Sequence, residues 1–354
     1  MHDPVPIRRF DSPSPDLDGA SILVTGGTGS FGQQFVRTVL DRYRPKRLVV
    51  FSRDELKQSE MAAVFSPDVH RCMRYFLGDV RDRMRLEFAM RGIDYVIHAA
   101  ALKQVPAAEY NPIECIHTNI IGAENIVYAA IRAGVKKVVA LSTDKAANPI
   151  NLYGASKLAS DKIFVAARHI AAGSPRFCVV RYGNVLGSRG SVVPFFLDLM
   201  AQGVDSLPVT DERMTRFWIS LEQGVDFVLS SLALMQDSEV FVPKIPSARV
   251  VDIAQWMAPH LKLRTVGIRP GEKLHEAMIP LDDARSTLEL PDRYILLPTP
   301  AHSDTPRREF GGSTPVDESF SYTSDKNNEW IDRDAFLAAV HSKFPDKRHL
   351  LPAS

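Results

Sequence analysis

The sequence predicts an α/β fold in which a Rossmann-like, doubly wound parallel sheet is followed by a smaller, irregular C-terminal lobe. Short β-branched runs alternate with longer amphipathic stretches from Ala20 onward, which is typical of βαβ units. A glycine-rich segment at 26–32 separates the first run from the first amphipathic stretch. After Arg181 the alternation is lost, and glycine and proline interrupt shorter segments.

The first strand is expected over 22–25 and the first helix over 31–43. Apolar residues recur at helical spacing in that helix, so one of its faces packs on a sheet; they are Phe35, Val36, Val39, Leu40 and Tyr43. Further strands, each followed by a helix, are expected at 47–51, 74–77, 95–99, 137–141 and 177–181. Such strands form a parallel sheet that helices cover on both faces.

The pattern also predicts how the chain divides into domains. A Rossmann domain is expected over 19–185, with a return near 217–245, and the irregular lobe over 186–216 and 246–298. A partly irregular tail is expected over 299–354. The segment 298–328 is rich in Pro, Ser, Thr, Gly and charged residues, which predicts a long loop, and 332–340 predicts a short helix.

Composition excludes several classes of function. Lys and Arg number 43 against 42 Asp and Glu, so no basic excess favours a nucleic-acid partner. The three cysteines are scattered, which suggests neither a disulfide framework nor a metal site and fits a reducing cytoplasm. Residues 1–18 lack the apolar segment of a signal peptide, and no later run has the length and apolar character of a membrane span.

The glycine-rich segment has the spacing of a dinucleotide-binding turn. Gly26, Gly29 and Gly32 follow a predicted strand and open a predicted helix. Glycine at these positions lets the backbone approach a pyrophosphate at the helix N-terminus.

The end of the second strand favours NADP over NAD. Where an acidic residue would bind the ribose 2′-hydroxyl of NAD, the chain has Ser52 and Arg53, with Lys57 one helical turn further. An arginine beside a hydroxyl can hold a 2′-phosphate through charge-assisted hydrogen bonds. Asp54 keeps NAD as the alternative, in which Arg53 and Lys57 are solvated surface charges.

Two more groups follow strands at the carboxyl edge of the sheet, where ligands of open α/β folds gather. Asp79 follows the third strand and could accept a hydrogen bond from the adenine amine. His98 ends an apolar strand and is expected to be a hydrogen-bonded core residue rather than a catalyst.

Groups able to move protons gather between 142 and 157. Tyr153 and Lys157 are one turn apart on the same face of a helix, where the lysine could lower the tyrosine pKa from its usual value of about 10. Asp144 and Lys145 add a carboxylate and an amine just upstream. Alternatively, Thr143 and Asp144 simply cap the turn that follows a strand.

These motifs resemble those of a known family. The segment 25–32, Tyr153-x-x-x-Lys157 and the run 181–185 resemble the extended short-chain dehydrogenase/reductases that act on nucleotide sugars. More specific segments resemble the inverting UDP-N-acetylglucosamine 4,6-dehydratases; they lie at 52–57, 109–112, 142–146, 211–218, 241–246 and 269–276. The resemblance runs from about 20 to 294, and more faintly to 320–324. One departure is Gln104, where the family commonly has a histidine.

The resemblance implies three sets of site residues and no metal. The catalytic residues would be Thr143, Asp144, Lys145, Tyr153 and Lys157. The cofactor-binding residues would be Gly26, Thr28, Gly29, Ser30, Phe31, Gly32, Ser52, Arg53, Asp54, Glu55, Leu56, Lys57, Asp79, Val80, Ala99, Ala100, Lys103, Thr118, Asn119, Tyr153 and Lys157. The residues binding the UDP-sugar would be Lys103, Asn184, Val192, Val193, Pro194, Phe195, Phe196, Arg216, Arg269 and Glu272.

The resemblance also implies a reaction. Tyr153 would remove the proton of the sugar 4-hydroxyl while C4 passes hydride to NADP⁺, with Lys157 supporting the phenolate. Lys145 would remove the C5 proton and Asp144 would help the 6-hydroxyl leave as water, or the two would share one proton as a coupled pair. Hydride would return to C6, and protonation of C5 from the opposite face would invert that centre.

Other functions remain as alternatives. A nucleotide-sugar 4-epimerase uses the same Tyr and Lys but needs no groups for elimination, and C5-retaining dehydratases carry Asp-Glu in place of Asp144 and Lys145. A non-catalytic NADP-sensing protein typically lacks the Tyr or the Lys. The expected partners are UDP-N-acetylglucosamine and further copies of the chain, as a dimer or a hexamer, and the expected pathway is pseudaminic-acid-type or surface-glycan synthesis.

Overall fold

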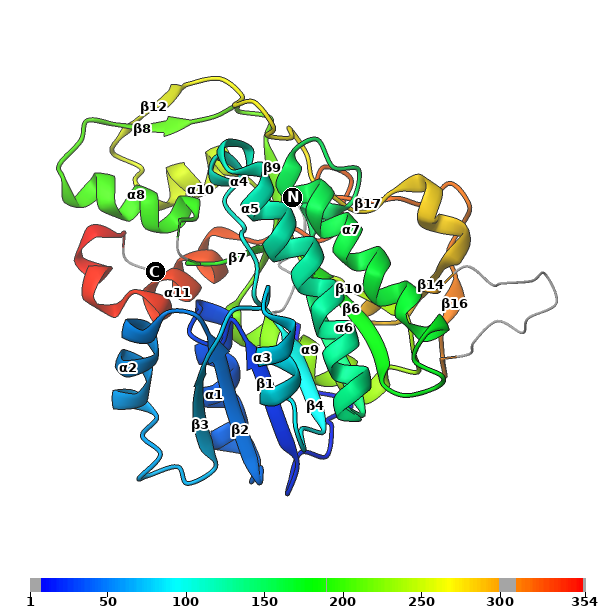
Figure 1. Cartoon of the computed structure of the whole chain (residues 1–354). Coiled ribbons are helices and arrows are strands. Elements are labelled where there is room, and N and C mark those ends of the chain that lie inside the picture. Colours follow the sequence, from blue (N-terminus) through cyan, green and yellow to red (C-terminus); the bar gives the residue numbers. More distant parts are fainter. Residues whose placement is uncertain (1–7, 189, 299–309, 353–354) are drawn as a thin grey trace.

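A ten-stranded sheet forms the centre of the molecule in the computed structural model, which describes residues 8–188, 190–298 and 310–352 (Figure 1). Its order is β16-β14-β15-β10-β6-β5-β4-β1-β2-β3. The strands are β1 Ser21–Thr25, β2 Arg47–Ser52, β3 Met73–Leu77, β4 Tyr95–His98, β5 Lys137–Thr143, β6 Arg176–Tyr182, β10 Glu239–Pro243, β14 Thr287–Glu289, β15 Arg293–Leu296 and β16 Thr314–Pro315. Strands from β3 to β10 pair in parallel, whereas β15, β14 and β16 extend the sheet in antiparallel fashion.

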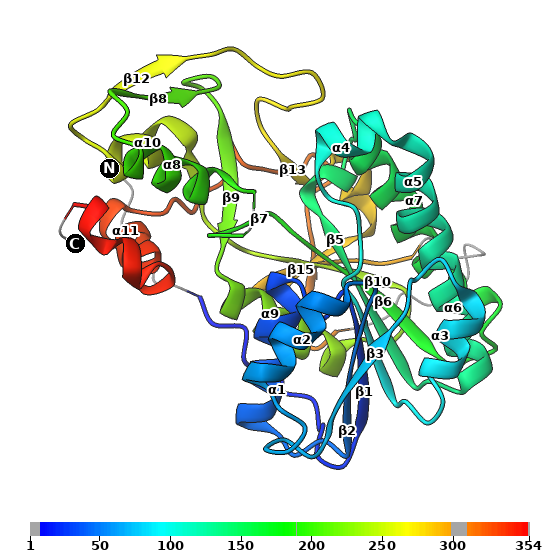
Figure 2. The same ribbon diagram turned by 60° about the vertical axis from the view of Figure 1, so that its left-hand side comes forward.

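Helices cover both faces of this sheet, as the apolar strands require. Figure 2 shows α1, α2 and α9 on one face and α3, α6 and α7 on the other. These helices are α1 Ser30–Arg42, α2 Glu55–Val64, α3 Arg83–Ala89, α6 Gly122–Ala133, α7 Leu152–Ala166 and α9 Leu221–Leu234. The apolar face predicted for α1 is buried at Phe35, Val36 and Val39, so the prediction of a doubly wound sheet is confirmed.

The chain after β6 differs from the prediction that a helix follows each strand. The short strand β7, Asn184–Val185, follows instead, and the next helix begins at Val192. The backbone passes directly over Phe217 at Gly183, where a Cβ would lie 2.6 Å from the phenylalanine Cβ. After β4, the chain forms two short helices and a π-helical turn where a single helix was predicted. These are α4 Val105–Tyr110, α5 Pro112–Ile116 and the turn His117–Ile121, which leads into α6.

The smaller lobe has a hydrophobic core of its own, in which Phe196, Trp218, Ile253 and Phe336 are buried. Its helices are α8 Val192–Ala201, α10 Val250–Met257 and α11 Arg333–Lys343. Its strands are β7, β9 Thr215–Ile219 and β11 Ser247–Arg249 in one sheet, and β8 Ser206–Val209 with β12 Lys262–Thr265 in another. A further pair, β13 Ala277–Ile279 and β17 Tyr322–Thr323, packs on the main core through Met278, Ile279 and Tyr322.

The expected division of the C-terminal half needs correction. Strands β14 and β15 fall inside the expected lobe segment 246–298 but belong to the main sheet, because Ile295 and Leu296 are buried in the main core. Part of the expected irregular tail is ordered as well: Phe310 and Tyr322 are buried in that core. The predicted helix at 332–340 is confirmed as α11, which completes the lobe core, whereas 299–309 lie outside the described residues.

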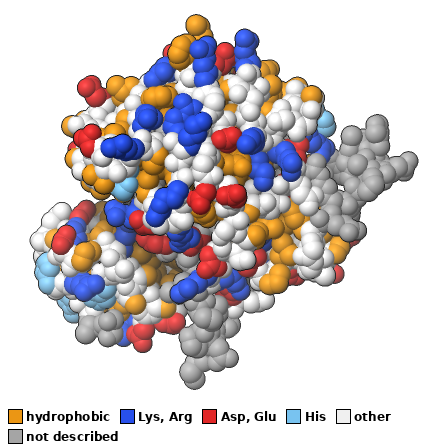
Figure 3. All heavy atoms as spheres, turned by 90° about the horizontal axis from the view of Figure 1, so that it is seen from below, with side chains coloured by type: hydrophobic (Ala, Val, Ile, Leu, Met, Phe, Trp, Pro, Cys, Tyr) orange, Lys and Arg blue, Asp and Glu red, His pale blue; other side chains and the backbone are white. Residues whose placement is uncertain are grey.

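The surface carries charges of both signs. Figure 3 shows Lys and Arg side chains interspersed with Asp and Glu on one face of the molecule, in line with a formal net charge of +1. Within the described ranges, no helix combines the length and the apolar character that crossing a bilayer requires.

Candidate active site

A cavity of about 1120 Å³ opens at the carboxyl ends of the parallel strands and extends to the smaller lobe. It begins at the glycine-rich turn between β1 and α1 and continues past α7 to residues of α8 and β9. Its volume exceeds that of most small-molecule sites, which measure roughly 300–1,000 Å³. One cavity therefore has room for two ligands placed end to end.

The glycine-rich turn at the start of α1 packs tightly on its own backbone and on the residues that follow β4. Gly26 has φ +63°, and a Cβ there would lie 2.8 Å from the amide nitrogen of Ala100. A Cβ at Gly32 would overlap the carbonyl of Gly27. All six predicted residues of the turn line the cavity, namely Gly26, Thr28, Gly29, Ser30, Phe31 and Gly32. Since the free amides of a helix N-terminus point at this space, the turn fits the pyrophosphate of a dinucleotide.

The tip of β2 supplies positive charge to the same cavity. Arg53 lines it with a side chain that is 57% exposed, and its guanidinium lies 3.8 Å from the Asp79 carboxylate. Lys57 also lines it, but its ammonium is paired with Asp54 at 2.6 Å. The predicted residues Glu55 and Leu56 do not line the cavity, because the first turn of α2 directs them outward, and Leu56 is 69% exposed.

The third and fourth strands place most of the other predicted cofactor residues. Those that line the cavity are Ser52, Asp54, Asp79, Val80, Ala99, Ala100, Lys103 and Thr118. Asp79 accepts hydrogen bonds from the backbone and guanidinium of Arg81, at 3.0 and 2.7 Å. Asn119 is an exception among the predictions, because its buried amide instead bonds both backbone groups of Leu102, at 2.8 and 2.9 Å, and so fixes the loop that carries Lys103.

His98 is a core residue, as predicted. It is 1% exposed, and its Nδ1 lies 2.8 Å from the hydroxyl of Thr25. Burial lowers the pKa of its imidazole to about 3, with a further contribution from Lys157. His98 therefore stays neutral and joins β1 to β4 below the glycine turn.

Tyr153 and Lys157 lie on one face of α7 and both line the cavity. Lys157 donates a hydrogen bond to the carbonyl of Leu141 at 2.7 Å. The expectation that Lys157 lowers the Tyr153 pKa is wrong for this arrangement. Burial raises the pKa of Tyr153 to about 12, and the opposing influences come from Lys145 and from a hydrogen bond to Thr143.

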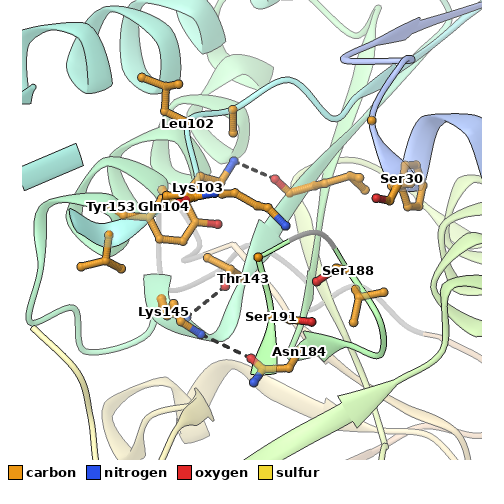
Figure 4. Close-up of a pocket in the computed structure, with 18 of the residues that line it drawn as sticks. Ser30, Leu102, Lys103, Gln104, Thr143, Lys145, Tyr153, Asn184, Ser188 and Ser191 are labelled. Carbon is orange, nitrogen blue, oxygen red and sulfur yellow. Dashed lines mark hydrogen bonds between the residues drawn. The ribbon is translucent and has the colours of Figure 1, made fainter. Parts of the chain in front are cut away.

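Thr143, Asp144 and Lys145 form a connected chain of polar groups at the end of β5. The Thr143 hydroxyl donates to Asp144 Oδ1 at 2.8 Å, and Lys145 Nζ lies 3.1 Å from the same oxygen. Thr143 also caps the short 3₁₀ turn Asp144–Ala146, which the capping alternative anticipated. Figure 4 shows Thr143, Lys145 and Tyr153 directed into one space.

Asp144 itself does not reach the cavity. It is fully buried and is not among the residues that line the space, although Thr143 and Lys145 are. Its Oδ2 is buried and has no hydrogen-bond partner within the part of the chain that the structure describes. The expectation that Asp144 contacts a substrate directly therefore needs correction, and any proton it exchanges with a ligand passes through Thr143 or Lys145.

A second carboxylate approaches Lys145 from the other side of the cavity. Glu276 Oε1 lies 3.3 Å from Lys145 Nζ. Burial lowers the pKa of the Lys145 ammonium, but attraction to Asp144 and Glu276 outweighs it, and the pKa lies above its usual value. In this state Lys145 carries its proton.

The predicted substrate residues come from both domains. Asn184 Oδ1 accepts a hydrogen bond from Lys145 Nζ at 3.5 Å, and Figure 4 shows this contact at the cavity wall. The other predicted residues that line the cavity are Val192, Pro194, Phe195, Phe196, Arg216, Arg269 and Glu272. Val193 does not, because the first turn of α8 directs it into the lobe core.

Arg216 is not the surface residue that its aromatic neighbours would suggest. It is 6% exposed, and it donates hydrogen bonds to the carbonyls of Thr215, Leu274 and Lys273. Next to it, Phe217 is buried in the main core and Trp218 in the lobe core. Arg216 therefore fixes the segment that ends at Glu276 against β9.

Sequence reasoning missed two charged residues of the site, Lys273 and Glu276. Both line the cavity, and Lys273 Nζ donates to the carbonyl of Ala147 at 2.6 Å. The sequence indicated these two residues only as members of the motif at 269–276, and that motif does not show where they lie relative to Lys145.

Gln104, the departure from the family pattern, lines the cavity beside Gly190. Among the described residues, no group of three or more His, Cys, Asp or Glu is arranged to hold a metal.

Comparison with known proteins places these features in context. Residues 22–298 match the sequence profile of a family described as polysaccharide biosynthesis protein. A UDP-N-acetylglucosamine 4,6-dehydratase (inverting) from Campylobacter jejuni is 54% identical over 331 residues, covering 92% of this chain and 98% of that protein. A UDP-glucose 4-epimerase from Rickettsia akari is 41% identical over 286 residues, covering 77% of this chain and 82% of that protein.

Solved structures show the same fold. The crystal structure of Pen from Bacillus thuringiensis superposes with a TM-score of 0.83 at 33% identity, covering 95% of this chain and 99% of that one. DesIV, a dTDP-glucose 4,6-dehydratase from Streptomyces venezuelae, superposes with a TM-score of 0.64 at 24% identity, covering 72% of this chain and 86% of that one.

Proposed function

Because the chain belongs to the polysaccharide biosynthesis protein family, we propose that it dehydrates UDP-N-acetylglucosamine across C4–C6 with inversion at C5. The product is UDP-2-acetamido-2,6-dideoxy-β-L-arabino-hex-4-ulose. The Campylobacter jejuni relatives that carry this activity in their names match nearly the whole of both chains. Such a reaction is an elimination that uses redox chemistry internally and consumes no cofactor.

The observation that carries the proposal is the position of Lys145 beside Tyr153. Both line one cavity, and the Lys145 ammonium is paired with Asp144. A 4-epimerase needs only the group that exchanges a proton with the 4-hydroxyl, so it has no use for a second proton-transfer group at this position. C5-retaining dehydratases would have a carboxylate where this chain has Lys145. The geometry therefore favours elimination with inversion over both alternatives.

Tyr153 would take the proton of the 4-hydroxyl as a phenolate; since burial raises its pKa to about 12, the positive charge of a bound oxidised nicotinamide would have to lower that pKa. The Tyr153 phenol is hydrogen-bonded to Thr143, which lines the same cavity and would bond the 4-oxygen. Lys157 lines the cavity on the same helix face and would hold the ribose of the cofactor. When bound, a nicotinamide would supply the hydride acceptor for C4 and the hydride donor for C6.

Lys145 exchanges protons with the sugar during elimination. The 4-ketone acidifies the C5 proton, and Lys145 can remove it once its own proton has passed to Asp144, 3.1 Å away. Lys145 then gives the proton from C5 to the 6-hydroxyl, which leaves as water. When hydride has been added to C6, C5 would take a solvent-derived proton on the face opposite Lys145, which inverts that centre. In this scheme Asp144 acts through Lys145, which agrees with its complete burial.

NADP is the proposed cofactor. A Cβ at Gly26 would collide with the backbone of Ala100 and one at Gly32 with that of Gly27, so only glycine permits this tight turn, which lines the cavity at the start of α1 and fits a dinucleotide. Among the described residues, the Arg53 guanidinium makes no ion pair closer than its 3.8 Å contact with Asp79, and its side chain is 57% exposed, so it is accessible to a 2′-phosphate. Lys57 adds positive charge nearby.

The UDP-sugar is proposed to lie between the sheet and the lobe. Arg269 lines that end of the cavity and suits a diphosphate through paired charge-assisted bonds, while Phe195 and Pro194 offer apolar surface. Self-association of the chain remains a prediction.

The proposed reaction can be tested in deuterated water. The purified protein is incubated with UDP-N-acetylglucosamine, and the product is followed by mass spectrometry and NMR. We expect loss of water, one deuterium at C5 in inverted configuration, and no net change of the cofactor. Recovery of UDP-N-acetylgalactosamine alone would contradict the proposal and favour the epimerase.

Two variants separate the steps. Lys145→Ala should abolish exchange at C5, and Tyr153→Phe should abolish hydride transfer as well, each lowering the rate by about 10²–10⁴-fold, the usual contribution of a general acid or base. Lys136→Ala is the control, because Lys136 is an exposed lysine paired with Asp94 far from the cavity. Full activity of Lys145→Ala would show that its role has been misassigned.

A further inference from the structure

Glu276 is a buried carboxylate that the mechanism above does not use. It is 2% exposed, immediately precedes β13, and lines the cavity. Its backbone is held on both sides by Ser324, whose hydroxyl accepts from the Glu276 amide at 2.9 Å and whose amide donates to the Glu276 carbonyl at 2.8 Å. The position of this carboxylate is therefore fixed by the fold rather than by a flexible loop.

The carboxylate of Glu276 is poorly satisfied for a buried ion. Oε1 lies 3.3 Å from Lys145 Nζ and 3.8 Å from Arg216 Nε. Oε2 lies 3.7 Å from Lys273 Nζ and has no hydrogen-bond partner among the described residues. Burying a charge in this way costs free energy unless it is well paired, so stability alone gives little reason for a glutamate here.

The two carboxylates beside Lys145 come from segments that lie far apart in the sequence. Asp144 is its neighbour at the end of β5, whereas Glu276 arrives on a segment that comes from the lobe. That segment is joined to the turn after β5 by two bonds, from Lys273 Nζ to the Ala147 carbonyl and from Asn151 Nδ2 to the Gly271 carbonyl. The surroundings of Lys145 are thus complete only when the lobe segment is in place.

We propose that Glu276 is a positioning residue for Lys145, holding the ammonium toward the cavity and setting the pH at which it loses its proton. The proposal rests on the function proposed above, in which Lys145 exchanges protons with the sugar. With carboxylates at 3.1 and 3.3 Å, the Lys145 ammonium is drawn to a point between Asp144 and Glu276, beside Asn184. Either carboxylate can also receive the proton that Lys145 must release.

The charges around Lys145 make its pKa depend strongly on Glu276. The groups that act on it from the surrounding elements are Asp144, Tyr153, Arg216, Glu276, Lys103 and Lys273. Three of these are cations, and each of them favours the neutral amine. Removing the charge of Glu276 leaves Asp144 as the one carboxylate among these groups, so the pKa of Lys145 must fall.

The test replaces the charge while keeping the shape. In Glu276→Gln, the rate at which acetic anhydride labels Lys145 at a fixed pH, measured by mass spectrometry of its peptide, should rise about tenfold or more, since one pKa unit changes the neutral fraction tenfold. The limb of the pH profile of kcat that reports Lys145 should move to lower pH by a similar amount. KM for UDP-N-acetylglucosamine should stay within about threefold, because ground-state binding is not altered.

Two further variants keep the test decisive. Glu276→Asp retains the charge on a shorter side chain and should restore labelling of Lys145 most of the way to the wild-type rate. Glu289→Gln removes the partner of Lys244, a part-buried pair at 2.6 Å, and should change labelling of Lys244 but not of Lys145. If Glu276→Gln lowers the melting temperature yet leaves both Lys145 labelling and the pH profile unchanged, Glu276 is merely structural and the proposal is overturned.

Failure of this proposal can be told apart from failure of the proposed function. Labelling of Lys145 needs no substrate, so it reports the effect of Glu276 even if the wild-type protein performs no dehydration. Conversely, wild-type dehydration with unchanged labelling in Glu276→Gln would contradict the role of Glu276 alone.

Discussion

Arg53 is the residue on which the choice between the two dinucleotides depends. Its side chain projects from the end of β2 into the cavity, where more than half of it is exposed. The charge of Lys57 is compensated more fully than that of Arg53, because Asp54 pairs with the Lys57 ammonium and also caps α2. A 2′-phosphate would therefore gain more from Arg53 than from Lys57.

We expect Arg53→Ser to weaken NADP binding by about tenfold while leaving NAD binding nearly unchanged, since a charge-assisted bond is worth about 1.5–3 kcal/mol and exposure screens part of it. Titration calorimetry of cofactor-free protein measures both affinities. Arg83→Ser is the matched control, because Arg83 is paired with Glu87 on the exposed face of α3. Tighter binding of NAD than of NADP by the wild type would refute the NADP proposal.

At the scale of elements, α7 packs on the turn after β5. This contact brings Tyr153, proposed to act at the 4-hydroxyl, close to Lys145, proposed to act at C5. Gly154 makes it possible: a Cβ there would overlap the carbonyl of Lys145 and lie 3.1 Å from the Pro149 side chain. Asn151 caps the start of the helix, and its side chain accepts a hydrogen bond from the Gly154 amide at 2.7 Å. Tyr153 and Lys145 can face one space because no side chain separates their backbones.

Gly154→Ala should push this turn away from α7. We expect an activity loss of more than about tenfold and a decrease of about 1–3 kcal/mol in the free energy of unfolding, as for overpacking in a core. Gly311→Ala serves as the control, because its Cβ would meet open space. Urea unfolding and the rate of C5 deuteration provide the two measurements, and wild-type values for both would show that the turn can move without consequence.

For the whole molecule, the segment before β1 links the main sheet to the C-terminal region. Phe10 is fully buried against Phe227 of α9, with ring centroids 5.0 Å apart. Arg8 makes a two-bonded contact with Glu329, at 2.7 and 2.9 Å, and also donates to the Lys244 carbonyl. This N-terminal segment therefore stabilises the packing of regions that lie far apart in the sequence.

Phe10→Ala should lower the free energy of unfolding by about 3 kcal/mol, the lower end of the range for deleting a buried phenylalanine. Arg9→Ala, one residue earlier and exposed, should leave it unchanged. Both values come from urea unfolding followed by circular dichroism. A loss below about 1 kcal/mol for Phe10→Ala would mean that the N-terminal segment adds little to the stability of the core.

The sequence predicted the main domain well because its signals are local. Apolar spacing located α1, and β-branched runs located β1 to β6 to within one or two residues. It did not predict that β14 and β15 join the main sheet, since short strands carry few residues and their partners are distant in the sequence. The same limit applies to Phe10, whose burial depends on a helix that begins more than 200 residues later.

The sequence by itself determined that this protein has a glycine turn for a dinucleotide and a Tyr and Lys on one helical face, because backbone clearance and helical periodicity are properties of neighbouring residues. Only the tertiary structure decided which groups surround Lys145. Asp144 is excluded from the cavity and Glu276 is brought into it by the packing of the lobe segment against the turn after β5. The electrostatics of a buried ion depend on such contacts, which no local pattern encodes.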